Sequence, residues 1–226
     1  DIILGIDPHD VDIATNMPLG ELEELYKTHD IGKSKTFGIV VVNVGGYSFE
    51  VANFRKDGKY QDGRRPDKIT ISATFEKDAE RRDFTINAMG IDKEGNIMDY
   101  FDGRKDIRDK VLKTVGDPKK RFSEDYLRMM RLGRFSAKLN LVIDKPTKKA
   151  AQRLSKNIKD LSSERIKEEL FKAASLGGKK FARYLEILDE LKLLRYILPE
   201  VLNLKYFKQS LEHHPEGKTG DTLSGS

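Results

Sequence analysis

The sequence predicts an α+β protein, in which a small mixed sheet with flanking helices is followed by an all-helical segment. Two β-rich runs, GIVVVNV (38–44) and YSFEVANF (47–54), are separated by a Gly-Gly pair, which is a strong β-hairpin signal. Beyond residue 115 the apolar residues recur at helical spacing, and the one candidate strand is a short LVI at 141–143. At 226 residues the chain is long enough to bury a substantial core.

The N-terminal part is expected to alternate strands and helices around this hairpin. Residues 16–28 begin with an asparagine that can cap a helix and continue with an early proline and helical spacing. The polar, glycine-rich residues 57–68 predict a loop. The expected elements, in chain order, are a strand at 11–15, a helix at 16–28, the hairpin at 38–54, a loop at 57–68, a strand at 69–73 and a helix at 76–91.

The C-terminal part is expected to be a set of helices with Ser, Gly or Pro at their borders. These helices are predicted at residues 121–140, 145–158, 162–177 and 178–194. Because the pattern changes after Gly116-Asp117-Pro118, we place a domain boundary there.

Composition and charge narrow the class of protein. The chain has no cysteine, which excludes a disulfide framework, a thiolate metal site and a cysteine nucleophile. No apolar run approaches the ~18–20 residues of a membrane span and no secretory signal opens the chain, so we expect a cytoplasmic protein without a membrane partner. Residues 1–103 carry a net charge of −7 and the rest +12. The basic half is either a surface for phosphate or nucleic acid, or a set of solvated lysine-rich helices.

Three carboxylates near the hairpin form a candidate metal site. Asp10 and Asp12 are one residue apart, so on extended chain their side chains would share a face, roughly 6–7 Å apart. If Phe49 and Val51 face the core, Glu50 between them lies on the other face of its strand. Carboxylates and substrate phosphates together bind Mg²⁺, and two such ions can promote an in-line phosphoryl transfer. The alternative is a solvated strand edge.

A second candidate site lies in FSEDYLRMMRLGRF, at residues 122–135. On one helix Asp125 and Arg128 share a face, and Arg131 and Arg134 continue the three-residue step as a slanted stripe. A carboxylate that accepts from an exocyclic amine, beside a guanidinium fork, favours the bases C and A over U and G. The other arginines would then face a triphosphate. The alternative is an Asp125–Arg128 ion pair with exposed arginines beyond it.

These stretches, in this order, resemble the class II tRNA nucleotidyltransferase and poly(A) polymerase family, within the DNA polymerase beta-like nucleotidyltransferase superfamily. The resemblance spans residues 1 to about 205. It is carried by LGIDPHDVDIATN, FEVANFRKDGKYQDGRRPDKI, ERRDFTINAMGID, DYFDGRKDIRDKVLKTVGDPKKRFSEDYLRMMRLGRF and, more weakly, SSERIKEELFKAA.

The resemblance implies a role for each candidate residue of the head. Asp10 and Asp12 would bind magnesium as the family's Asp-x-Asp, and Glu50 matches the third acid. Arg82, in a segment that alone is typical of a capped amphipathic helix, matches a residue that contacts the nucleotide.

The resemblance also assigns the second site. Asp125 and Arg128 match the pair that reads the base edge of CTP or ATP, and Arg131 and Arg134 match further nucleotide-binding positions. The loop DGKYQDGRRP matches the segment linked to the switch from C to A addition, which argues against an enzyme that adds only C.

The implied activity is template-independent addition of CMP and AMP to the 3′ end of tRNA by a two-metal Mg²⁺ mechanism, with release of pyrophosphate. A poly(A) polymerase, an A-only adding enzyme and a non-catalytic RNA-binding module remain alternatives. The implied domains are a nucleotidyltransferase head at 1–116 that lacks its N-terminal part, a helical neck at 117–205, which binds nucleotide and RNA, and a linker or truncated body at 206–226.

Overall fold

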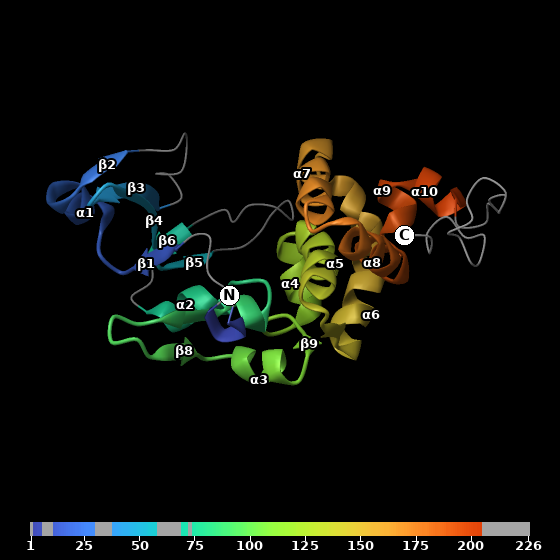
Figure 1. Ribbon diagram of the computed structural model, residues 1–226, viewed down its shortest axis with the longest axis horizontal. Coiled ribbons are helices and arrows are strands. Elements are labelled where there is room, and N and C mark those ends of the chain that lie inside the picture. The colour runs from blue at the N-terminus through green and yellow to red at the C-terminus, as the bar shows by residue number, and fades with distance from the viewer. Residues whose placement is uncertain (1, 6–10, 30–37, 58–68, 72–73, 205–226) are drawn as a thin grey trace.

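The computed structural model of this chain describes residues 2–5, 11–29, 38–57, 69–71 and 74–204 (Figure 1). Its mixed sheet lies toward one end and the helices from α5 (Leu127–Leu139) to α8 (Gly178–Glu190) lie toward the other, which confirms the predicted α+β class. Asp10, most of the expected polar loop and the expected linker lie outside the described residues.

The four-stranded sheet contains the predicted hairpin. Its strand order is β1-β4-β3-β2, where β1 is parallel to β4 and the other neighbours are antiparallel. Gly45 and Gly46 join β3 to β4 with φ values of 58° and 85°, a conformation that glycine adopts without steric cost. The bounds are β1 Ile13–Thr15, β2 Lys27–His29, β3 Ile39–Val44 and β4 Tyr47–Asn53.

One face of this sheet is covered by α1 (Leu19–Leu25). Leu22 of α1 packs with Val40, Val42 and Val51 in a small core. The predicted helix at 16–28 is too long, because the chain after Tyr26 leaves the helix and forms the edge strand β2 against β3. Pairing with a strand already in place thus overrides the local helical spacing.

A second layer of short strands and helices follows the sheet. Within it, the helix predicted at 76–91 ends at residue 80, so the prediction is wrong for residues 81–91. Phe84 is fully buried in extended conformation and forms a bridge with Thr114, which ends the helical path. The elements of this layer are β5 Arg55–Asp57, β6 Ile69–Ile71, α2 Phe75–Glu80, the 3₁₀ turn Thr85–Asn87, β7 Met89–Ile91, β8 Ile97–Asp99 and α3 Gly103–Arg108.

The short strand predicted at 141–143 is confirmed as β10 (Val142–Ile143). Its partner is β9 (Val111–Leu112), and the two run parallel. The pairing joins the helical part to the segment that follows α3.

The helical part contains one break that the sequence pattern does not predict. Instead of one helix at 121–140, α4 ends at Glu124 and α5 begins at Leu127, because Asp125 is extended (φ −155°). The helices are α4 Pro118–Glu124, α5 Leu127–Leu139, α6 Lys145–Leu154, α7 Ser163–Ala174, α8 Gly178–Glu190, α9 Leu194–Ile197 and α10 Pro199–Leu204, with a 3₁₀ segment at Ser155–Asp160.

The largest core lies among these helices and extends into the preceding layer. Phe84 and Leu112 pack in the same cluster as Met130 and Tyr184. Burial of each such side chain contributes about 1.5–3 kcal/mol, so the helices and the layer stabilise each other. Among the described helices, none is both long and apolar enough to cross a membrane.

Candidate functional site

The sheet places two of the three predicted metal-binding carboxylates level with each other. Ile13, the first residue of β1, pairs with Val51 in parallel register, so Asp12, which directly precedes β1, and Glu50 of β4 each lie one residue before this pair. Val51 is buried and Glu50 is exposed on the opposite face, as the alternation predicts. Asp10 lies outside the described residues. Within the described ranges, no group of three metal-ligating side chains is assembled.

A buried carboxylate, Asp78 in α2, organises the segment that contains Arg82. The Asp78 side chain is only 2% exposed. It accepts two hydrogen bonds from Arg81 (3.0 and 2.6 Å) and two from Arg82 (3.2 and 3.1 Å). It also accepts the backbone N–H of Arg55 at 3.2 Å. Asp78 therefore links β5, which directly follows the Glu50 strand, to the predicted nucleotide-binding Arg82.

Asp83 connects this segment to the arginine helix α5. Arg131 Nε donates to Asp83 Oδ2 at 2.7 Å, and Asn87 Nδ2 donates to Asp83 Oδ1 at 3.1 Å. Arg82 Nη1 donates in turn to the Asn87 carbonyl at 3.0 Å. Burial lowers the pKa of Arg131, but the charge and hydrogen bond of Asp83 outweigh it and the pKa is raised. Arg131 therefore stays cationic at this contact between α5 and the segment 81–87.

Asp125 occupies the break between α4 and α5. Arg165 of α7 donates Nη1 to Oδ1 at 3.1 Å and Nη2 to Oδ2 at 2.8 Å. The Leu127 backbone N–H donates to Asp125 Oδ1 at 3.0 Å. Side-chain bonds of this kind compete with helical backbone bonds, and this explains why the helix is interrupted here.

Arg128 does not form the ion pair with Asp125 that helix spacing alone suggests. Arg128 Nη1 donates to Glu124 Oε2 at 2.6 Å, and its two Nη groups also donate to the carbonyls of Arg121 and Arg81. Glu124 in addition accepts from Arg121 at 2.7 Å. The alternative of an Asp125–Arg128 pair is therefore wrong, because each residue has another partner.

The last arginines of the stripe, Arg131 and Arg134, also have partners. Arg134 Nε donates to Glu169 Oε1 at 2.5 Å, and both side chains are largely buried. Arg131 and Arg134 lie against the ring of Phe135, with guanidinium carbons 5.3 and 4.6 Å from its centroid. The arginines beyond Arg128 are thus not the freely exposed cations that the alternative reading expected.

The structure brings Arg128 and Arg131 to the segment of Arg82, but among the described residues no direct contact links these arginines to the carboxylates of the sheet. Arg128 and Arg131 both donate to the segment 81–87, which contains Arg82. The connection to the Glu50 strand runs through Arg55 and Asp78.

Sequence reasoning missed five acidic or basic partners, one of which is Asp83, 48 residues from Arg131. Asp78 and Glu124 were detectable, since they precede their arginines by three or four residues in helical sequence. Arg165 and Glu169 are 40 and 35 residues from their partners, so no local spacing indicates them.

Two known protein-family models match parts of this chain. The model of the poly A polymerase head domain matches residues 1–113. A second model, described as the probable RNA and SrmB-binding site of polymerase A, matches residues 140–204.

Individual relatives agree with these matches. The CCA-adding enzyme of Lactobacillus helveticus is 43% identical over 173 residues, which are 76% of this chain and 43% of that protein. A crystal structure of the Bacillus stearothermophilus CCA-adding enzyme in complex with CTP has a TM-score of 0.75 and 37% identity, and covers 85% of this chain and 46% of that one. A tRNA nucleotidyltransferase complexed with a primer tRNA and an incoming ATP analog has a TM-score of 0.69 and 28% identity, with 91% and 60% covered.

The chain thus spans about half the length of the curated relatives it matches. The first family model covers half of the chain and includes the first three segments on which the sequence resemblance depends. The chain belongs to the family of the poly A polymerase head domain.

Proposed function

We propose that this chain is the catalytic and nucleotide-selecting part of an enzyme that adds CMP and AMP, from CTP and ATP, to the 3′ end of tRNA. The relatives named CCA-adding enzyme support this proposal. The observation that carries it is the arrangement at the start of α5, where Asp125 and Arg128 lie within one turn and each is held by a separate charged partner.

This arrangement suits base recognition. The Arg128 backbone N–H donates to the Asp125 carbonyl at 3.1 Å, so the two side chains leave the same turn. An oriented carboxylate accepts a hydrogen bond from the exocyclic amine that C and A share, and the guanidinium donates to a neighbouring ring or carbonyl acceptor. The bonds to Arg165 and Glu124 reduce the conformational freedom that nucleotide binding would otherwise have to remove.

The arginines of the stripe have separate tasks in this proposal. Arg82 and Arg131 are each about one-third exposed, so they can donate to triphosphate oxygens while they keep their acidic partners. Arg134 is more deeply buried against Glu169, and it supports nucleotide binding by holding α5 against α7.

The carboxylates Asp10, Asp12 and Glu50 would hold Mg²⁺. Hard cations prefer carboxylate oxygens, and Asp12 and Glu50 are exposed, level with each other and without a hydrogen-bond or ion-pair partner among the described residues. A Mg²⁺ ion held by these carboxylates would supply positive charge for activating the RNA 3′-hydroxyl and for neutralising the triphosphate.

The test is an incorporation assay with tRNA that lacks its 3′ end, Mg²⁺ and one nucleotide at a time. Addition of C and then A, with addition ending at a defined length, is the expected result. Addition of A alone points to an A-adding enzyme, and continued addition of A points to a poly(A) polymerase. RNA binding without any incorporation, and without dependence on Mg²⁺, would contradict the proposal.

A further inference from the structure

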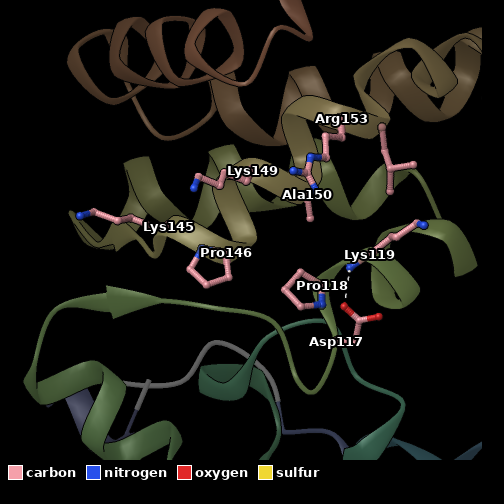
Figure 2. A pocket seen from close by; sticks show the side chains of 9 residues that line it. Asp117, Pro118, Lys119, Lys145, Pro146, Lys149, Ala150 and Arg153 are labelled. Atoms are coloured by element: carbon pink, nitrogen blue, oxygen red, sulfur yellow. Dashed lines mark hydrogen bonds between the residues drawn. The ribbon is translucent and has the colours of Figure 1, made fainter.

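The 3₁₀ segment that follows α6 reaches the start of α5. Helix α6 lines a hollow of about 510 Å³ together with α4, and Arg153, near the end of α6, still borders it (Figure 2). Beyond α6 the chain continues as the 3₁₀ segment Ser155–Asp160, in which Ile158 is fully buried in the main core. Its neighbour Asn157 is not among the residues that line the hollow.

Asn157 binds the residue that directly follows Asp125. Asn157 Nδ2 donates a hydrogen bond of 2.9 Å to Tyr126 Oη, although the two residues are 31 positions apart. Both side chains are partly buried, and the Tyr126 ring also packs against the main core. Water competes less well for a bond in such surroundings, so the bond holds Tyr126 in place relative to the 3₁₀ segment.

Tyr126 lies where the chain changes from extended to helical conformation. Asp125 is extended (φ −155°, ψ 110°), whereas Tyr126 is already helical (φ −64°, ψ −21°). The first turn of α5 is closed by two backbone bonds of 3.1 Å, from Arg128 N–H to the Asp125 carbonyl and from Met129 N–H to the Tyr126 carbonyl. A rotation of the backbone at Tyr126 would therefore move the Asp125 carboxylate relative to the Arg128 guanidinium.

Three side chains of this junction are held by three different elements. The partners are Arg165 of α7 for Asp125, Asn157 of the 3₁₀ segment for Tyr126, and Glu124 of α4 for Arg128. The first and the third of these contacts orient a charged group. The contact of Tyr126 has no charge to compensate, and a phenylalanine ring could fill the same space in the core. Packing alone thus accounts for the ring but not for the hydroxyl.

We propose that Tyr126 and Asn157 are positioning residues for base selection, whose hydrogen bond fixes the junction so that Asp125 and Arg128 meet the base together. The proposal rests on the proposed function and deepens it, because it adds two residues to the choice of nucleotide. Both act through Asp125 and Arg128 and do not touch the nucleotide. Preorganisation of this kind reduces the conformational freedom that binding of the correct base has to remove.

The experiment measures single-nucleotide incorporation by the whole chain on tRNA that lacks its 3′ end. Tyr126→Phe keeps the ring and removes only the hydroxyl, and Asn157→Ala removes the other partner of the same bond. We expect the ratio of kcat/KM for CTP over UTP to fall roughly 2- to 10-fold in each variant, the range that one neutral hydrogen bond supports. The double variant should lose no more than either single variant, because all three lack the same bond.

Tyr196→Phe is the matched control. Tyr196 is a partly buried tyrosine of α9 that also packs against the main core, and no described residue forms a hydrogen bond with its hydroxyl. The ratio for CTP over UTP should be unchanged in this variant. The midpoint of thermal unfolding is measured on every protein. If Tyr126→Phe is unstable, Asn157→Ala, at a partly exposed position, tests the same bond from the other side.

A contact with a structural role only would lower kcat/KM for CTP and UTP alike, so an unchanged ratio in Tyr126→Phe and Asn157→Ala would overturn the proposal. A higher KM for tRNA in Asn157→Ala, with an unchanged nucleotide ratio, would also overturn it, because Asn157 would then belong to the RNA contact. An equal fall of the ratio in Tyr196→Phe would do the same.

Failure of the proposed function gives a different result. If the unmodified chain incorporated neither C nor A, the proposed function and this inference would fall together. If the unmodified chain selects C and A, and the variants at Tyr126 and Asn157 select them equally well, only this inference is overturned.

Discussion

Arg165 holds the carboxylate of Asp125 through two parallel hydrogen bonds, at 3.1 and 2.8 Å, although the two residues are 40 positions apart. Both side chains are about four-fifths buried. The planar guanidinium fork matches the two carboxylate oxygens, so it fixes the rotation as well as the position of Asp125. In the proposed function Arg165 is therefore a positioning residue, because it acts on the base through Asp125.

Replacement of Arg165 by methionine should relax base selection. We expect the ratio of kcat/KM for CTP over UTP to fall roughly 10- to 100-fold, because a well-oriented base contact is worth about 1–3 kcal/mol of discrimination. The measurement is single-nucleotide incorporation with each triphosphate. Asp125→Ala should give a similar loss, and the double variant should add little to it, because both changes remove the same oriented carboxylate.

Arg165→Lys is the matched control, since it keeps the charge but loses the fork. It should recover the thermal stability lost in Arg165→Met but only part of the selectivity. If the ratio of kcat/KM for CTP over UTP were the same in the unmodified protein, Arg165→Met and Arg165→Lys, the base would have to be read by other residues.

Substitution of Asp12 should remove activity without unfolding the protein. Asp12 is exposed just before β1, so Asp12→Ala removes no buried contact among the described residues. We expect incorporation to fall by at least about 100-fold, because even loss of an outer-shell partner costs a metal site 10- to 100-fold. Glu50→Gln should act in the same direction. Activity and Mn²⁺ binding are measured together on each variant.

Glu21→Gln is a suitable control for these changes. Glu21 is an exposed carboxylate on α1, and Glu50 lies on the sheet face opposite to the one that α1 covers. Activity and Mn²⁺ affinity should be unaffected. A fully active Asp12→Ala enzyme would remove the carboxylate site from the proposed mechanism.

Asp78→Ala should be strongly destabilising. The buried carboxylate compensates the charges of Arg81 and Arg82 and also binds the Arg55 backbone, so its replacement removes two ion pairs of partly buried guanidinium groups and one backbone contact. Breaking a buried ion pair by removal of one partner typically costs about 3–5 kcal/mol. The measurement is urea unfolding followed by circular dichroism.

Glu76→Ala, on the exposed side of the same helix, should change the free energy of unfolding by no more than about 0.5 kcal/mol. If Asp78→Ala were as stable as Glu76→Ala, the Asp78 network would not be what joins β5 to the arginine segment.

Glu190 should make the helical part sensitive to acid. Lys148 donates to Glu190 Oε2 at 2.6 Å and Arg183 donates to Oε1 at 3.3 Å. Burial alone would raise the pKa of Glu190, but these two cations outweigh it and hold the pKa below its ordinary value of 4.5. The ionised Glu190, with its two cations, therefore stabilises the fold above pH 4.5. This contribution is lost as the pH falls through the lower pKa that Glu190 has in the folded state.

The predicted observation is a decrease in the midpoint of thermal unfolding below pH 4.5 that is smaller in Glu190→Gln. Asp160→Asn, at an exposed carboxylate without a partner among the described residues, should leave the decrease unchanged. Identical pH profiles for all three proteins would show that the α6–α8 contact does not depend on this charge.

Local patterns were sufficient for much of the fold. The Gly45-Gly46 hairpin follows from the two-residue turn that only positive φ values can form. Successive side chains of a strand point to opposite faces. The exposure of Glu50 therefore follows once the apolar Val51 is assigned to the core face. The helices of the second half follow from the 3.6-residue period, and the end of α5 at a left-handed Asn140 follows from its known preference there.

Local patterns failed where distant residues compete with them. Residues 81–91 have helical spacing, yet Phe84 is extended because its ring enters the main core and its backbone pairs with Thr114. The helix expected across Asp125 is interrupted because that carboxylate bonds to Leu127 and Arg165.

From its residues alone, this chain could be assigned its α+β class and its family, and candidates for its acidic and basic site residues could be proposed. The partners of those residues emerged from folding, because Asp83 with Arg131 and Glu169 with Arg134 meet across 48 and 35 positions. Periodicity reports neighbours within a turn or a strand pair, whereas such distant pairs depend on how whole helices pack against one another.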